Sequence, residues 1–153
     1  MCLSKFYFRA ALIIVALSLL GLLSIPLVKA DAVQINLASK HLTYGHYDYS
    51  EFNPGVTVSK NLTALNEGKG YIMAGYYLNS VKRNSFFTGV GWREDWFGME
   101  VGLITGYNMC VAPMVSPYFQ YSVFKANVIP IVSHKALFDG VALGFSLNFE
   151  VNK

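Results

Sequence analysis

The chain has 153 residues, of which 54 % are hydrophobic and 14 % charged, and its formal net charge is +3. This composition is too apolar and too poor in charge for a typical soluble domain. Three of the 12 basic residues, Lys5, Arg9 and Lys29, lie in the first 30 positions, which leaves nine basic against nine acidic residues. The remaining chain is therefore neutral, and its charge gives no reason to expect a nucleic acid partner.

The N-terminal segment resembles an export signal. A continuous apolar run at 10–27 follows Lys5 and Arg9 and ends in Val28, Lys29 and Ala30. A positive region, an apolar region and a small-residue cleavage site form the pattern of a secretory signal peptide. We predict a cleaved signal peptide at 1–30 and a mature domain at 31–153. A retained membrane anchor is the alternative, because roughly 18 apolar residues reach the lower limit for spanning a bilayer.

The two cysteines predict no disulfide in the mature chain, because Cys2 leaves with the signal peptide and Cys110 then has no intramolecular partner. No motif points to a metal, nucleotide or redox cofactor.

The mature chain has no further run long enough for a membrane helix, but it repeats windows of about ten residues in which apolar and small or polar residues alternate. Such alternation is typical of strands whose two faces meet different surroundings. We expect eight strands, at 31–38, 52–60, 70–80, 85–93, 97–107, 112–121, 123–132 and 140–151. Their number and spacing predict an all-β, eight-stranded antiparallel transmembrane β-barrel.

This fold places the protein in the outer membrane of a Gram-negative envelope, reached through the secretion and barrel-assembly machinery. With the first strand starting on the periplasmic side, the segments 39–51, 81–84, 108–111 and 133–139 face outward. A tight turn at 93–96, Trp92 beside it and the many Tyr and Phe residues supply aromatic belts for both interfaces. The alternative is that these aromatic residues fill a soluble core.

The inward faces of the predicted strands are rich in glycine, which leaves room for an acyl chain inside the barrel. The glycines concerned are Gly75, Gly98, Gly102, Gly106 and Gly144. Alternation also turns Glu100 and Glu150 inward, where Lys125 or Gln34 would serve as polar partners.

Prolines fall within or beside the predicted strands at Pro54, Pro113, Pro117 and Pro130. Each removes one ladder hydrogen bond, so together they could open gaps through which a lipid enters sideways. On spacing alone, strand ends and bulges are the favoured explanation.

The order of several short segments resembles the outer-membrane lipid A palmitoyltransferase family. The segments are 74–80 (AGYYLNS), 89–92 (GVGW), 102–106 (GLITG), the strand at 113–117 and 128–130 (VIP). The resemblance implies an eight-stranded barrel that holds an acyl chain, with prolines beside two lateral openings. It also implies a lipid-binding role for Pro54, Gly75, Gly102, Pro113, Pro117 and Pro130.

The family's catalytic pattern is altered here. The family has a His after the first strand-breaking proline and an Asp-Ser pair at the outer end of the third strand, and the matching positions are Ser59 and Asn79-Ser80. Of these positions only Ser80 matches the family. The Asn79 amide cannot replace the family's carboxylate as a base.

The first outward loop offers a replacement base. It contains His41 and His46, with Asp48 two residues after His46, so we predict a catalytic set of Ser80, His46 and Asp48. Solvated loop side chains are the simpler alternative, and this is also how we interpret His134.

Lys82 and Arg83 follow Ser80 and would bind lipopolysaccharide phosphates, or else act as ordinary loop charges. The expected function is therefore binding or modification of envelope lipid, either phospholipid or lipopolysaccharide. Two alternatives are a non-enzymatic surface barrel acting in adhesion, phage adsorption or envelope integrity, and a soluble periplasmic lipid carrier.

Overall fold

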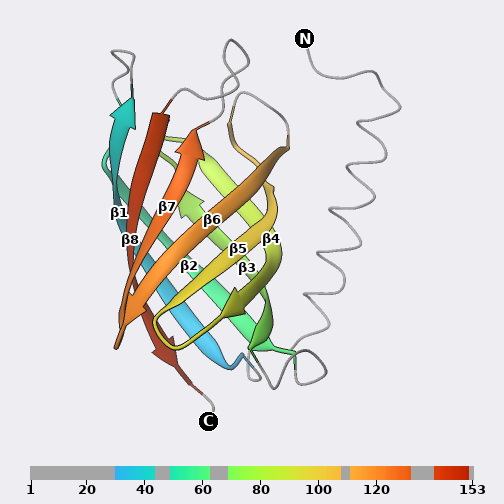
Figure 1. Ribbon diagram of the computed structural model, residues 1–153. Coiled ribbons are helices and arrows are strands. Elements are labelled where there is room, and N and C mark those ends of the chain that lie inside the picture. Colours follow the sequence, from blue (N-terminus) through green and yellow to red (C-terminus); the bar gives the residue numbers. More distant parts are fainter. Residues whose placement is uncertain (1–29, 44–48, 63–68, 108–110, 132–139, 152–153) are drawn as a thin grey trace.

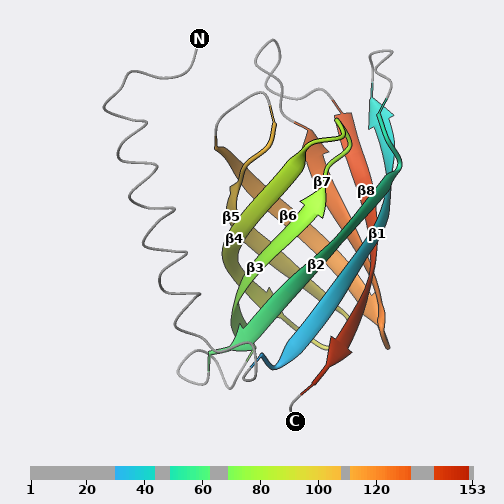
Figure 2. The same cartoon turned by 180° about the vertical axis from the view of Figure 1, so that it is seen from behind.

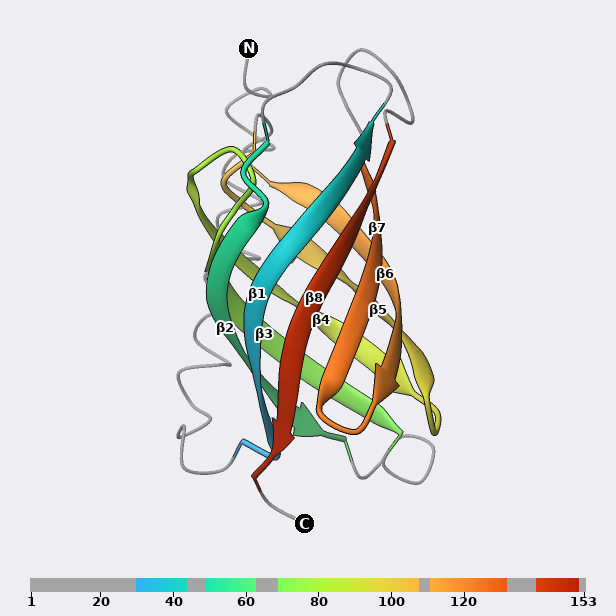
Figure 3. The same cartoon turned by 90° about the vertical axis from the view of Figure 1, so that its left-hand side faces the viewer.

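The computed structural model describes residues 30–43, 49–62, 69–107, 111–131 and 140–151, and most of the predicted signal peptide lies outside these residues. The chain forms a closed barrel of eight antiparallel strands in sequence order, and β1 pairs with β8 to complete it (Figures 1 and 3). The strands are β1 Ala32–Thr43, β2 Phe52–Asn61, β3 Gly70–Leu78, β4 Asn84–Arg93, β5 Phe97–Ile104, β6 Ala112–Tyr121, β7 Phe124–Ile131 and β8 Gly140–Glu150. The predicted all-β, eight-stranded barrel is confirmed.

The two ends of the barrel differ. At the terminal end β1 begins, β8 ends, and the segments 62–69, 94–96 and 122–123 connect strands. The loop end carries the connections 44–51, 79–83, 105–111 and 132–139. Figure 2 shows the wall formed by β1 to β4, with these strands strongly tilted between the two ends.

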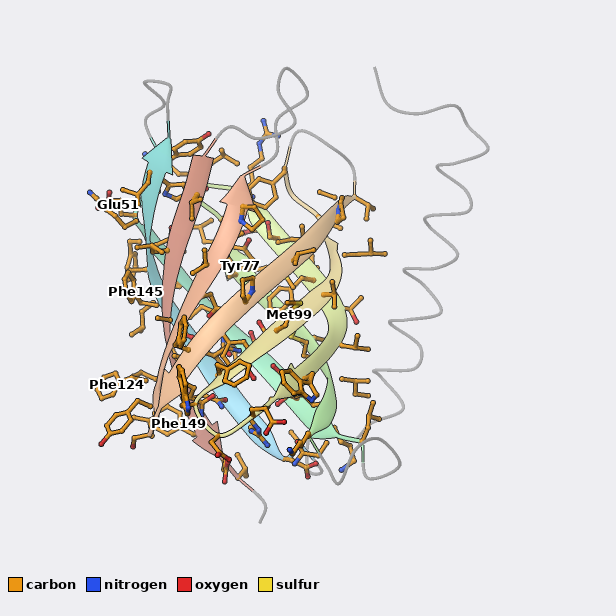
Figure 4. The ribbon with its side chains drawn as sticks, in the orientation of Figure 1. Glu51, Tyr77, Met99, Phe124, Phe145 and Phe149 are labelled. Carbon is orange, nitrogen blue, oxygen red and sulfur yellow. The ribbon has the colours of Figure 1, made fainter. Side chains whose placement is uncertain are left out.

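The barrel wall is apolar on the outside and partly polar within. Large hydrophobic side chains face outward on every strand, including Ile35, Val56, Tyr76, Phe86, Val101, Val115, Phe124 and Phe145. Figure 4 shows Met99, Phe124, Phe145 and Phe149 projecting from the ribbon. The buried polar side chains include Thr57, Glu100, Ser116, Lys125, Asn127 and Ser146. Both features depart from the usual pattern, in which exposed apolar residues are scattered singly and buried charges are rare.

The interior changes character along the barrel axis. Toward the terminal end it holds a polar network around a cavity of about 20 Å³, lined by residues that include Gln34, Tyr71, Glu100 and Lys125. Such a volume accommodates about one water molecule. Toward the loop end, inward positions carry Phe87, Ile104, Met114, Ile129 and Ala142. The interior is therefore divided into a polar half around a small cavity and an apolar half.

The prediction that β1 ends at residue 38 was wrong. Its register against both neighbours shifts between Asn36 and Ala38, and beyond this bulge the strand continues to Thr43, paired with β8. The first loop is therefore shorter than predicted, and His41 lies in the strand.

Two other predicted strands were too long. β3 ends at Leu78, which leaves Asn79 and Ser80 in the following turn, and β5 ends at Ile104. Gly106 was predicted to face the interior of a strand. It instead adopts a left-handed conformation (φ 88°), and a Cβ there would lie 2.5 Å from the Asn84 carbonyl oxygen. This position therefore favours glycine for the turn and not for interior space.

Aromatic rings gather on the outside of the terminal end, around the turn at 94–96, which was predicted at 93–96. Trp96 stacks on Phe119 with ring centroids 5.5 Å apart, and both tryptophans contact Phe97 edge to face. In the described part of the chain, no helix has the length and apolar character needed to cross a membrane.

Candidate functional site

The barrel wall has an incomplete junction between β6 and β7. These strands pair only through the four positions next to their turn, from Tyr121 with Phe124 to Tyr118 with Asn127. Within the described strands, no backbone pair joins 112–117 to 128–131, and we call this stretch the β6–β7 seam. Figure 1 shows the two ribbons diverging toward the loop end. The other seven junctions are paired over longer stretches.

Three prolines explain why the ladder stops. The Gln120 amide donates to the Trp96 carbonyl on the β5 side. Because successive residues of a strand direct their backbone groups to opposite neighbours, the odd-numbered Pro113 and Pro117 of β6 turn their nitrogens toward β7. Just before β7, the Val123 carbonyl accepts a hydrogen bond from the Asn148 amide of β8. By the same alternation, the even-numbered Pro130 of β7 faces β6. Each proline therefore lacks a donor at a position where the ladder requires one.

The seam opens toward the apolar half of the interior. Met114 and Ile129 face inward from its two strands, and Ala142 and Gly144 lie next to them on β8. A Cβ at Gly144 would meet only ordinary contacts of 3.6 Å to Asn127 and Ile129. At the lower edge of the seam, the Asn127 amide donates to Ser116 across the junction at 2.9 Å. An apolar chain entering here would meet flexible or small apolar side chains.

Pro54 marks a filled irregularity and not a second open junction. The Ser59 carbonyl accepts a hydrogen bond from the Asp31 amide on the β1 side. Because backbone groups alternate in direction along a strand, the even-numbered Pro54 faces β3, where the ladder ends at the pair of Gly55 with Tyr77. The Asn53 amide donates to the Leu78 carbonyl instead, at 3.3 Å. At Pro54 the structure therefore fits the bulge explanation.

The inward glycines do not leave a continuous channel. A Cβ at Gly75 would lie 2.4 Å from the Phe87 ring, and one at Gly102 would lie 2.2 Å from the Thr88 carbonyl oxygen. Gly91 and Gly98 accommodate the rings of Tyr71 and Tyr118 in the same way. The space that the sequence suggested is occupied by aromatic side chains and neighbouring backbone, except beside Gly144.

Asn79 is a structural residue at the loop end. Its side chain is fully buried, its amide donates to the Ser85 hydroxyl and the Gly106 carbonyl, and its oxygen accepts from the Val81 and Arg83 amides. An amide with all these bonds satisfied holds the β3–β4 turn against the β5–β6 loop.

Ser80 is buried at 5 % exposure beside this turn. Its carbonyl accepts a hydrogen bond from the Ser50 amide at 2.8 Å, and its side chain lies against the Tyr107 hydroxyl. Burial raises the pKa of the Tyr107 phenol, while hydrogen bonds from Tyr77 and Ser80 oppose this shift. Tyr107 therefore remains a neutral hydrogen-bonding partner at physiological pH.

His41 is the site residue that the sequence analysis underrated. It lies near the loop end of β1, and its ring stacks on Tyr49 at 4.4 Å. Its Nδ1 is buried and has no hydrogen-bond partner among the described residues. The residue after Tyr49 is Ser50, which binds Ser80, so one short segment contacts both His41 and Ser80.

The other predicted site residues are dispersed. Ser59 pairs with Ala32 at the terminal end, so it cannot share a site with Ser80. His46, Asp48 and His134 lie outside the described residues, so the catalytic set of Ser80, His46 and Asp48 stays a prediction. Lys82 and Arg83 are exposed in the β3–β4 turn, as a phosphate-binding role would require.

The terminal half of the interior is held by a buried ion pair. Lys125 on β7 binds Glu100 on β5, with the side chains 4 % and 8 % exposed. Tyr71 and Asn127 donate to the same carboxylate at 2.9 and 3.3 Å, and Lys125 also donates to Gln34 at 3.0 Å. The prediction that Lys125 would partner an inward Glu100 is confirmed. At the barrel end, Glu150 lies 3.8 Å from Arg93.

Comparison with known proteins gives no assignment, since no family model matches the chain and no curated protein is significantly similar to it. Within the described residues, no group of three or more His, Cys, Asp or Glu side chains is arranged to hold a metal ion.

Proposed function

We propose that the barrel spans the outer membrane and binds an acyl chain of an envelope lipid through the β6–β7 seam. An apolar outer wall around a partly polar interior supports the membrane setting, because the strands of a transmembrane barrel alternate apolar side chains facing lipid with polar ones facing the interior. The observation that carries the proposal is the seam itself, in which three prolines face a single junction beside the apolar half of the interior.

The arrangement at the loop end supports acyl transfer as the reaction, in which an ester of a phospholipid is broken, its acyl chain forms a new ester with a hydroxyl of lipid A, and the lysophospholipid leaves with the proton. An entering chain would place its ester near the loop end, where Ser80 and His41 share the segment of Tyr49 and Ser50. A neutral imidazole with an unoccupied nitrogen can accept a proton, whereas the Asn79 amide cannot. We therefore propose His41 as the base, in place of His46, with Ser80 as its hydroxyl partner. Exposed Lys82 and Arg83 would hold lipid A phosphates.

Closing the seam tests this proposal. The double variant Pro117→Ala, Pro130→Ala supplies two donors at ladder positions, each worth about 1 kcal/mol when bonded. Opening the seam would then cost about 2 kcal/mol more, which corresponds to roughly thirtyfold slower acyl-chain entry. We expect an equal fall in the rate of lipid A modification, measured by mass spectrometry, together with higher resistance to urea.

Pro54→Ala is the matched control, because Asn53 already binds the Leu78 carbonyl that faces it. This variant should modify lipid A at the wild-type rate. Wild-type activity in the stabilised double variant would show that the seam is not the route of entry.

One observation favours a second function. Asn79 stands at the position where the resembled family has a carboxylate. Its amide group is engaged in structural hydrogen bonds and cannot act as a base. A barrel that binds a lipid without transferring its chain, and acts through its outer loops, fits this feature. Such a barrel would bind lipid through the seam while the lipid A mass spectrum stayed unchanged.

A further inference from the structure

A second apolar site lies on the outside of the wall, at the terminal end of β6, β7 and β8. It is a groove of about 640 Å³, within the range of about 300–1,000 Å³ typical of ligand sites. Ala126 on β7 lies between Phe119 on β6 and Phe145 on β8, with which it is paired in register. The small side chain between two large ones forms the floor of the groove.

The walls of the groove are rings that the rest of the barrel leaves largely uncovered. Tyr121 is 84 % exposed and Phe124 65 % exposed, and Trp96 stacks nearly parallel to Phe119, with 19° between the rings. Figure 4 shows Phe124 and Phe145 projecting from the same side of the barrel. Flat, rigid walls of this kind suit an extended hydrocarbon chain, which gains contact along its whole length.

We propose that this groove binds one acyl chain of a glycerophospholipid from the leaflet at the terminal end of the barrel. The inference rests on the membrane setting of the proposed function, but it concerns a lipid other than the one that enters the seam. The groove ends where the seam begins, since the pair of Phe119 with Ala126 lies two positions below Pro117. A chain seated there would cover the paired part of the β6–β7 junction directly beneath the seam.

The groove should accept different lipid headgroups equally. Lys125 is the only charged residue among the described residues that line it, and its ammonium group points into the interior, toward Glu100. No charged side chain of the groove is thus directed at a headgroup, so zwitterionic and anionic phospholipids should bind with similar affinity.

Trp96 provides a direct reporter of occupancy. In a Trp92→Phe background it is the only tryptophan, because the chain has two. The barrel, purified in detergent, is titrated with phosphatidylethanolamine brominated on its acyl chains. We expect saturable quenching of Trp96 fluorescence at about one lipid per barrel, since a bound bromine lies against the ring.

Ala126→Phe fills the floor and should raise the half-quenching concentration about tenfold, because the loss of about two methylene contacts suffices for that change. Phe145→Ala removes one wall of the groove and should also raise the half-quenching concentration. It serves as the test if Ala126→Phe folds poorly. Val101→Phe adds a ring to the outward face of β5, away from the groove, and should leave the curve unchanged.

Quenching that rises without saturation, or an identical curve for wild type, Ala126→Phe and Phe145→Ala, would overturn the groove site. The site and the proposed acyl transfer fail separately. Saturable, Ala126-dependent quenching with an unchanged lipid A spectrum would remove the transfer and keep the groove.

Discussion

Lys125→Met is expected to destabilise the barrel by about 3–5 kcal/mol, because it leaves Glu100 buried without its cationic partner. Among the described residues, the carboxylate would keep only Tyr71 and Asn127 as donors. The pair also links β5 to β7 across β6, next to the junction with the fewest backbone pairs. The loss should therefore be concentrated where the wall is weakest. Urea unfolding in lipid vesicles, followed by heat-modifiable gel migration, measures it.

The double variant Glu100→Gln, Lys125→Met is the control for this prediction. Removing both charges eliminates the uncompensated ion and should recover most of the lost stability, since the pair is coupled. Lys60→Met is a second control, because Lys60 lies in a partly exposed ion pair with Asp31, at 3.5 Å. Exposed pairs of this kind are worth only about 0–1 kcal/mol. A Lys125→Met barrel as stable as the wild type would show that the ion pair does not hold the interior together.

His41→Ala and Ser80→Ala are expected to lower lipid A modification by about 10²–10⁴-fold, the range for loss of a general base or its hydroxyl partner. The buried Nδ1 of His41 makes no hydrogen bond to the described residues, so removal of the ring should cost only its stacking contact with Tyr49, about 0.5–1.5 kcal/mol. Heat-modifiable migration should therefore stay close to that of the wild type.

His46→Ala separates this assignment from the one that the sequence first suggested. Full activity in His46→Ala together with loss of activity in His41→Ala would support His41 as the base. The opposite result would assign the base to His46. Ser50→Ala is the control for Ser80→Ala and should keep full activity. Among the described residues, the Ser50 hydroxyl donates only to the Phe52 carbonyl, at 3.2 Å. The hydrogen bond from Ser50 to Ser80 comes from the backbone amide, which the substitution retains.

Alternation predicted all eight strands because the two faces of this wall meet opposite surroundings. Phe97, Met99 and Val101 point outward, and Gly98 and Glu100 point inward, as a period of two requires. The buried partner of Glu100 could also be predicted, since a charge in a packed interior needs an opposite charge or a strong donor.

The bulge at residue 37 could not be predicted from the pattern. It shifts the alternation by one residue, so β1 appeared to end at Ala38 and His41 appeared to lie in a loop. His46 was placed in the same loop and was preferred because Asp48 follows it two residues later. The positions of Pro54 and Pro117 looked equivalent in sequence, and both turn their nitrogen toward a ladder position of the neighbouring strand. They differ in that the Asn53 side chain supplies the donor missing at Pro54, whereas β6 and β7 are unpaired beyond Tyr118 and Asn127.

The most direct test of the central claim is the mass of lipid A from Gram-negative cells that express the protein, compared with cells carrying an empty vector. Heat-modifiable migration first establishes that the barrel is folded in the membrane fraction. Entry of a phospholipid chain through the seam, followed by transfer, predicts a new lipid A species heavier by one acyl chain. An unchanged spectrum from a folded, membrane-inserted barrel would contradict acyl transfer to lipid A.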